Sequence, residues 1–168
     1  MNALPALADL QEAMEYDALT GVFTWRRRDD RQNNWNAVYP GAQAGWLDGK
    51  GYLRITWDGV KLGLHRIAWK FLTGEDPAVE VDHENGIRSD NRASNLRLAT
   101  TSQNRMNMRA RGEWPKGVYK NKRGKFVAQI KCRGQMSYLG SFTSPEAAHQ
   151  AYAARAHELF GEFRCIDR

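Results

Sequence analysis

The sequence predicts an α+β fold made of small antiparallel sheets and short helices. Residues 52–57 alternate apolar and polar side chains and run into Asp58-Gly59, a strong hairpin signal. Residues 64–72 then carry apolar side chains at helical spacing. A final stretch predicts three strands followed by one alanine-rich helix. With 168 residues, the chain has room for one ordinary domain or for about two or three such modules.

Residues 1–50 are expected to form an N-terminal region. Apolar residues at helical spacing predict a short helix over residues 6–16. A turn signal at Thr20-Gly21 precedes a predicted strand at residues 22–25. Residues 26–43 are basic, rich in asparagine and irregular, which suits either a loop over a substrate or a solvated loop.

Residues 51–110 are predicted to form one core. A hairpin and a helix come first, and a strand, a loop, another strand and another helix follow. The first helix should stop at Thr73-Gly74, and Pro77 prevents its resumption. The remaining elements expected in this core are a return strand at residues 60–64, a strand at 79–83, a polar loop at 84–93, a strand at 95–99, and a helix from Thr101 or Ser102 to about Arg109.

A linker at residues 111–115, with Gly112 and Pro115, leads to a C-terminal module at residues 116–168. Its helix should begin at Ser144 as the N-cap and end at Gly161. Three strands should precede this helix, at residues 117–120, 125–131 and 136–142. Alternation in the middle strand predicts an apolar face toward the helix, formed by Phe126, Ala128 and Ile130. The opposite face should be open and carry Lys125, Val127, Gln129 and Lys131.

Charge is concentrated at the C-terminal end of the chain. The formal net charge is +6, and residues 113–168 hold 10 lysines and arginines against 5 acids. This distribution predicts a polyanionic partner for the C-terminal module. No apolar run reaches membrane-spanning length and the first residues lack a signal-peptide pattern, so we expect a cytoplasmic protein without a membrane partner. The two cysteines, Cys132 and Cys165, form no zinc-binding pattern.

One stretch carries the chemistry: Val81-Asp82-His83-Glu84-Asn85-Gly86, then Asp90-Asn91-Arg92, Asn95-Leu96-Arg97 and Ser102-Gln103-Asn104. It resembles the HNH endonuclease family, in the phage and intron-encoded branch whose third motif residue is asparagine. The resemblance implies a strand, loop, strand and helix around one divalent metal ion. It also implies that Asp82 and Asn104 are metal ligands, that His83 is the general base, and that Asn95 braces the loop and orients the histidine.

The residue types support this chemistry without the family name. A neutral imidazole can take a proton from water at cellular pH. A hard cation, Mg²⁺ or else Mn²⁺, held by a carboxylate and an amide oxygen can act as a Lewis acid on a phosphate. Neighbouring residues on a strand point to opposite faces, so the strand should end or bend at Asp82-His83. Taken singly, these residues would suit surface, turn or cap positions; their joint spacing favours a catalytic set.

The C-terminal module resembles the plant Apetala-two and ethylene-response-factor type of DNA-binding domain. The matching segments are Lys116-Gly117-Val118-Tyr119, residues 124–130, residues 138–142 and Ala147-Ala148 through Tyr152. Eight positions match the DNA contacts of that family: Lys116, Tyr119, Asn121, Arg123, Gln129, Lys131, Met136 and Tyr138. The family carries arginine or tryptophan at several of them, so we expect fewer guanine contacts and looser specificity here.

Together these features predict a metal-dependent endonuclease that nicks one strand of double-stranded DNA and uses its C-terminal module for positioning. No small-molecule cofactor is expected. A catalytically inactive DNA-binding regulator derived from such a nuclease is the alternative. His65 and Arg66 open a predicted helix, and a structural or phosphate-contacting role suits them as well as a chemical one.

Overall fold

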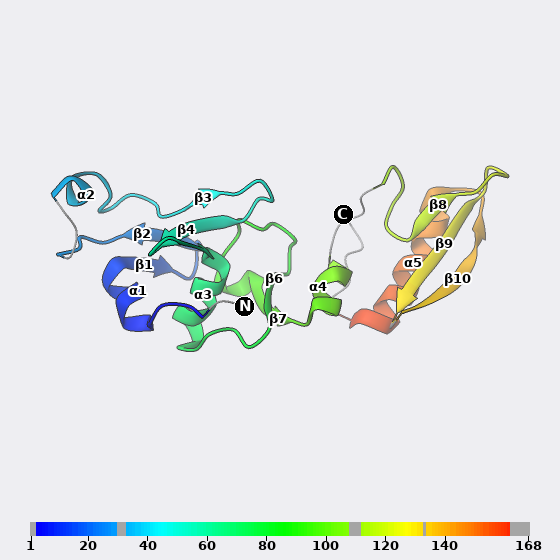
Figure 1. Ribbon diagram of the computed structural model, residues 1–168. Coiled ribbons are helices and arrows are strands. Elements are labelled where there is room, and N and C mark those ends of the chain that lie inside the picture. The colour runs from blue at the N-terminus through cyan, green and yellow to red at the C-terminus, as the bar shows by residue number, and fades with distance from the viewer. Residues whose placement is uncertain (1–2, 30–32, 108–111, 133, 162–168) are drawn as a thin grey trace. The chain divides into compact units, whose positions relative to one another are not determined.

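The computed structural model describes residues 3–29, 33–107, 112–132 and 134–161. The chain divides into two compact units, Met1–Thr100 and Thr101–Arg168, and Figure 1 shows the elements of each. Helices accompany small antiparallel sheets in both units, which agrees with the predicted α+β class. The helix predicted to run to Arg109 and the second cysteine, Cys165, reach beyond the described residues. Among the described residues, no helix has the length and apolar character needed to cross a membrane.

The first unit begins with a helix and a hairpin. Helix α1 (Leu7–Ala13) is followed by strand β1 (Met14–Asp17), which pairs with β2 (Val22–Trp25). The helix predicted over residues 6–16 is therefore too long, because its last part pairs as a strand. The turn explains the change: the Asp17 carboxylate accepts the Leu19 backbone N–H at 2.9 Å and closes the hairpin. A short helix, α2 (Asn33–Val38), lies within the segment predicted to be irregular.

A second sheet holds the strands β3 (Trp46–Leu47), β4 (Leu53–Trp57) and β5 (Val60–Gly63) in that order. Asp58 and Gly59 both have positive φ, as a two-residue hairpin requires. Helix α3 (Leu64–Thr73) follows and ends at Gly74, whose left-handed backbone donates to the Lys70 carbonyl at 2.8 Å.

Two further strands close the first unit. Strand β6 (Glu80–His83) pairs with β7 (Leu96–Ala99). A 3-10 turn, η1 (Ala93–Asn95), precedes β7, so Asn95 lies in this turn and not in the strand predicted to begin with it. Helix α4 (Thr101–Asn107) follows β7 in the chain and belongs to the second unit.

The first unit has one hydrophobic core, and residues 1–50 contribute to it. Leu10, Met14 and Phe23 are fully buried in the same cluster as Ile55 and Ile67. The N-terminal region, which the sequence suggested as a separate part, therefore packs with residues 51–100. Consequently the hairpin β1–β2 can support residues that follow much later in the chain.

The second unit contains a three-stranded antiparallel sheet covered on one face by a helix, as predicted. Its strands are β8 (Val118–Lys120), β9 (Phe126–Cys132) and β10 (Gln135–Phe142), and the helix is α5 (Pro145–Phe160). The Ser144 hydroxyl caps this helix by accepting from the Ala147 backbone N–H at 3.2 Å. The cores under the helix are formed by Phe126, Ala128 and Ala148 and by Ile130, Tyr152 and Ala156.

Two details of the sheet differ from simple alternation. Val127 was expected on the open face with an exposed side chain, but only 4% of it is exposed, between its cross-strand partners Tyr119 and Ser141. A bulge in β10 inserts Leu139 between Tyr138 and Gly140, and this leucine packs against the core.

Gly117 gives the first prediction. A Cβ at this position would lie 2.0 Å from the Tyr152 ring, and its φ is +78°. We expect Gly117→Ala to lower the free energy of unfolding of this unit by about 3 kcal/mol or more, from backbone strain plus overlap. Gly124→Ala is the matched control: its φ is +77° with nothing within 4 Å, so it should cost about 1 kcal/mol. Calorimetric unfolding of the whole chain measures both, and equal effects would contradict the packing argument.

Candidate active site

Strand β6 ends at His83, as the sequence predicted. The His83 carbonyl accepts the Gly86 backbone N–H at 2.8 Å, and Gly86 has a φ of +67°. The chain therefore turns directly after the motif residues. Asp82 and His83 are both buried, with 5% and 3% of their surfaces exposed. Their side chains point to opposite faces of the strand and contact different neighbours.

Asp82 forms an ion pair across the two strands. Its Oδ2 lies 3.1 Å from Nε of Arg97, its partner in the β6–β7 register. Both side chains are largely buried, so each charge depends on the other for stabilisation. The pair fixes the carboxylate at the end of β6, and a cation that reached Asp82 would share it with the guanidinium.

His83 contacts a second buried polar residue. Its Nε2 lies 3.1 Å from Oδ1 of Asn91, and Asn91 is only 1% exposed. When the Asn91 amide oxygen accepts this hydrogen bond, Nε2 of His83 carries the ring proton. Nδ1 then has the lone pair, which can accept a second proton. Burial lowers the pKa of His83 and so favours this neutral, proton-accepting form. The Asn91 Nδ2 is buried and has no hydrogen-bond partner among the described residues.

His65 lies beside His83. The two ring centroids are 5.4 Å apart, and the Tyr52 ring lies 5.1 Å from His65 and 5.9 Å from His83. Burial, together with the neighbouring His83, lowers the pKa of His65 to about 3. His65 is therefore neutral at cellular pH, and the helix-opening histidine whose role the sequence left open belongs to the surroundings of His83.

Asn95 holds the loop between β6 and η1. Its Oδ1 accepts the Asn85 backbone N–H at 2.8 Å, and its Nδ2 donates to the Asp90 carbonyl at 2.7 Å. The Asp90 carboxylate in turn takes two hydrogen bonds from Arg92, which hold the pKa of Asp90 at about 2. Asn95 thus spans the loop as expected, whereas the hydrogen bond to the histidine comes from Asn91, a residue to which the sequence assigned no role.

The N-terminal hairpin supports the same loop. The Tyr16 hydroxyl donates to the Asn91 carbonyl at 2.7 Å, and burial, with help from nearby carboxylates, raises the pKa of Tyr16 to about 12. A Cβ on Gly21 would lie 2.5 Å from the Arg92 nitrogen, so a glycine is needed where the hairpin turn meets the loop. These contacts connect residues more than seventy positions apart, and no local pattern in the sequence indicates them.

Asn104 lies on α4, within the second unit. Its pairing with Asp82 as a metal ligand therefore stays a prediction. Among the residues that the structure describes, no three His, Cys, Asp or Glu side chains come together as a metal-binding group.

Five of the eight residues predicted to contact DNA lie on the open face of the C-terminal sheet. Cross-strand pairs join Met136 to Lys131 and Tyr138 to Gln129, and Tyr119 lies on β8. Three of these side chains are large and exposed: Tyr119, Met136 and Tyr138, at 43%, 57% and 68%. The remaining three predicted residues, Lys116, Asn121 and Arg123, lie in segments beside the strands.

Asn121 also has a structural role. Its Oδ1 accepts the backbone N–H groups of Arg123 and Lys125, at 2.9 and 3.0 Å, and so shapes the turn between β8 and β9.

Part of the chain matches a known protein family. Residues 62–106, from β5 to α4, match the family model for HNH endonucleases. This segment of the chain is therefore similar to an HNH endonuclease domain. The chain is similar to an uncharacterized HNH endonuclease of Acanthamoeba polyphaga mimivirus, with 34% identity over 120 residues, or 70% of this chain. The chain covers 64% of that relative's length. No solved structure matches this chain.

Asn91 gives the second prediction. We expect Asn91→Leu, which keeps the volume but removes the amide, to lower plasmid cleavage about a hundredfold, because His83 loses the group that holds its ring. DNA binding, measured by fluorescence anisotropy, should change little. The control is Asn36→Leu, which removes another loop-bracing amide, bonded to the backbone of Arg28 at 2.9 and 2.7 Å. Equal losses of cleavage in both variants would mean that Asn91 acts only through stability.

Proposed function

We propose that the chain is a metal-dependent DNA endonuclease that cuts one strand of double-stranded DNA at each active site. The observation that carries the proposal is the position of His83: it lies beside Asp82 at the end of β6, inside the segment that matches HNH endonucleases, with Nε2 on Asn91. A buried, neutral imidazole oriented by an amide suits a general base.

His83 would take a proton from the attacking water at Nδ1, while Asn91 accepts from Nε2–H and keeps the ring in place. Asn95 would act on the histidine indirectly, by fixing the loop that carries Asn91. His65, neutral and packed against His83, would help to exclude water from one side of the ring. The two ring nitrogens of His83 would thus have different roles: Nε2 keeps its proton on Asn91, and Nδ1 accepts the proton of the water.

A divalent metal ion would complete the site, since HNH nucleases in general use one. The chemistry of the available donors fits: Asp82 offers a carboxylate held in place by Arg97, and Asn104 offers an amide oxygen. Oxygen ligands of this kind favour Mg²⁺, with Mn²⁺ as a substitute. When bound, the ion would supply Lewis-acid stabilisation to the phosphate and to the leaving oxygen.

The C-terminal unit would position the nuclease on DNA in the manner of an Apetala-two type domain. Its open sheet face combines lysine and glutamine with exposed tyrosines and a methionine, while α5 covers the other face. A basic, partly aromatic surface of this kind suits phosphate contacts together with contacts to base edges. The excess of basic residues in this part of the chain supports the same assignment.

Cleavage of supercoiled plasmid tests the nuclease. We expect nicked circles in Mg²⁺ and none in EDTA, with the His83→Ala variant about a hundredfold slower because the general base is lost. DNA binding by that variant should persist, which would show that it still folds. His157→Ala, a histidine on α5, is the control and should cut at the normal rate. A wild-type chain that binds DNA but cuts it in neither Mg²⁺ nor Mn²⁺ would favour the alternative, an inactive DNA-binding regulator.

The salt dependence of binding tests the role of the sheet. In EDTA, the double variant Lys125→Gln/Lys131→Gln should bind duplex DNA more weakly, and each lost phosphate contact should lower the logarithmic salt slope by about 0.9. Arg155→Gln removes a positive charge from α5, where Arg155 pairs with Glu158, and should leave the slope unchanged. If the helix variant changed the slope as much as the sheet variant, the open face would not be the DNA-binding surface.

A further inference from the structure

A cavity of about 580 Å³ lies at one end of the C-terminal sheet. It lies where β8 has ended: in the described part of the chain, β9 continues from Gln129 to Cys132 with no third strand beside it. The Gly117 carbonyl accepts the Gln129 backbone N–H at 2.9 Å beside this end of β9. Side chains from both faces of the sheet can therefore reach this edge.

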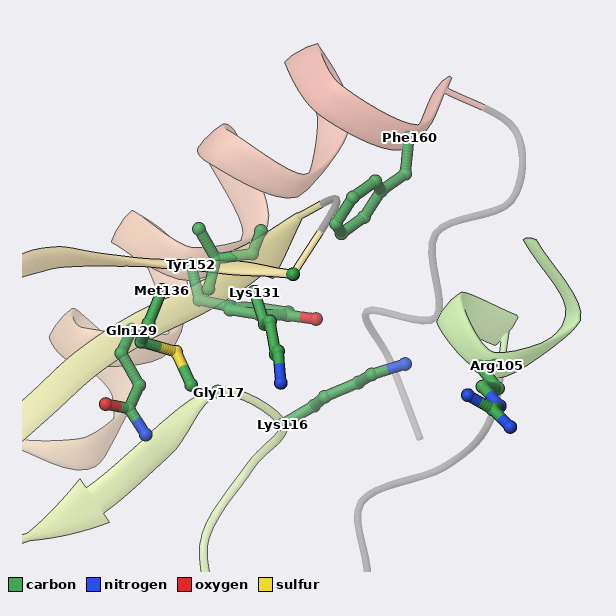
Figure 2. Close-up of a pocket in the computed structure, with 10 residues that line it drawn as sticks. Arg105, Lys116, Gly117, Gln129, Lys131, Met136, Tyr152 and Phe160 are labelled. Atoms are coloured by element: carbon green, nitrogen blue, oxygen red, sulfur yellow. The ribbon is translucent and has the colours of Figure 1, made fainter. Parts of the chain in front are cut away.

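The cavity is lined by polar and apolar side chains, as Figure 2 shows, and the polar ones include Arg105 and Gln129. Lys116 and Lys131 direct their ammonium groups into it, and the Tyr152 hydroxyl points to the same space. Tyr152 comes from α5 on the covered side, and its ring can lie at the edge only because Gly117 has no side chain. A cationic pair beside a hydroxyl donor suits a phosphate group.

The other part of the lining is apolar. Met136 comes from β10, and Phe160 comes from the end of α5. A single phosphate would use neither of them, and it would fill only a small part of the space. A volume of this size is typical of sites for whole small molecules. The combination of phosphate-binding groups with an aromatic ring and a thioether suits a nucleotide, whose base can pack on apolar and aromatic side chains.

We propose that this cavity binds one unpaired nucleotide of a DNA strand. Its phosphate lies between Lys116 and Lys131 near the Tyr152 hydroxyl, and its base packs against Met136 and Phe160. The proposal rests on the proposed function, because it requires the sheet face to lie on DNA. Bases of an intact duplex are stacked and cannot enter a cavity, so the site selects a strand end, a flap or an extruded base. The cavity shares Lys131 and Met136 with the open face, so the proposal concerns the preference for an unpaired strand over a duplex and not the affinity for DNA as such.

Binding of two DNA probes by the full chain in EDTA tests the proposal. One probe is a blunt duplex, and the other is the same duplex with a short unpaired overhang; fluorescence anisotropy gives both dissociation constants. We expect the overhang to be bound about fivefold more tightly, or more, since one base gains a stacking contact. Phe160→Ala and Lys116→Gln should reduce this ratio toward one. Tyr152→Phe, which keeps the packed ring, should reduce it in part.

The control is Tyr138→Ala, which removes an exposed aromatic side chain that does not line the cavity. It should weaken binding to both probes and leave their ratio unchanged. Equal wild-type affinity for the two probes would overturn the proposal, as would an undiminished ratio in Phe160→Ala and Lys116→Gln. Both results are compatible with plasmid nicking and duplex binding, so they are distinct from a failure of the nuclease assignment. A Phe160→Ala variant that failed to fold would lose blunt-duplex binding too, and Tyr152→Phe would then decide.

Discussion

The first unit depends on how it buries four polar side chains within one short stretch of chain. Asp82, His83, Asn91 and Asn95 are each at most 5% exposed. Burial of such groups is costly unless each finds a partner, and the partners come from within the stretch itself or from the strand beside it. Arg97 pairs with Asp82, Asn91 meets His83, and Asn95 spans the loop. The loop has therefore little freedom to adopt another conformation while these groups stay buried.

The N-terminal hairpin extends this network to residues that carry no motif. Tyr16 bonds to the backbone of the loop, and the Ala18 carbonyl accepts the Ala93 backbone N–H at 2.9 Å. Because Met14 and Phe23 are fully buried in the common core, the hairpin is a firm support. The same core holds α3, whose first turn brings His65 against His83. Residues around the motif are thus positioned by packing that begins at the start of the chain.

Many of the secondary-structure elements could be predicted from the sequence, and those features that could not be predicted have physical causes. Local signals placed the hairpin at Asp58-Gly59, the end of α3 and the cap of α5, because each depends on neighbouring residues. The motif also predicted a strand ending at Asp82-His83, and β6 does end at His83. Two features were missed. The strand at residues 14–17 forms because it pairs with β2, and this pairing overrides the local helical pattern. The contact between Asn91 and His83 depends on tertiary structure, which no local pattern indicates. In the sequence, nothing distinguishes Asn91 from the other asparagines of this segment.

The bulge in β10 divides that strand into two frames. Before it, Met136 and Tyr138 face outward; after it, Ser141 pairs with Val127 on the same side, while Phe142 packs into the core. A Cβ on Gly140 would lie 2.9 Å from the Phe142 ring. Anyone who wished to give this sheet a new recognition surface should therefore vary positions 136, 138 and 141, out of step with a regular strand. A library built on strict alternation would instead randomise positions 140 and 142, and most of its members would fail to fold.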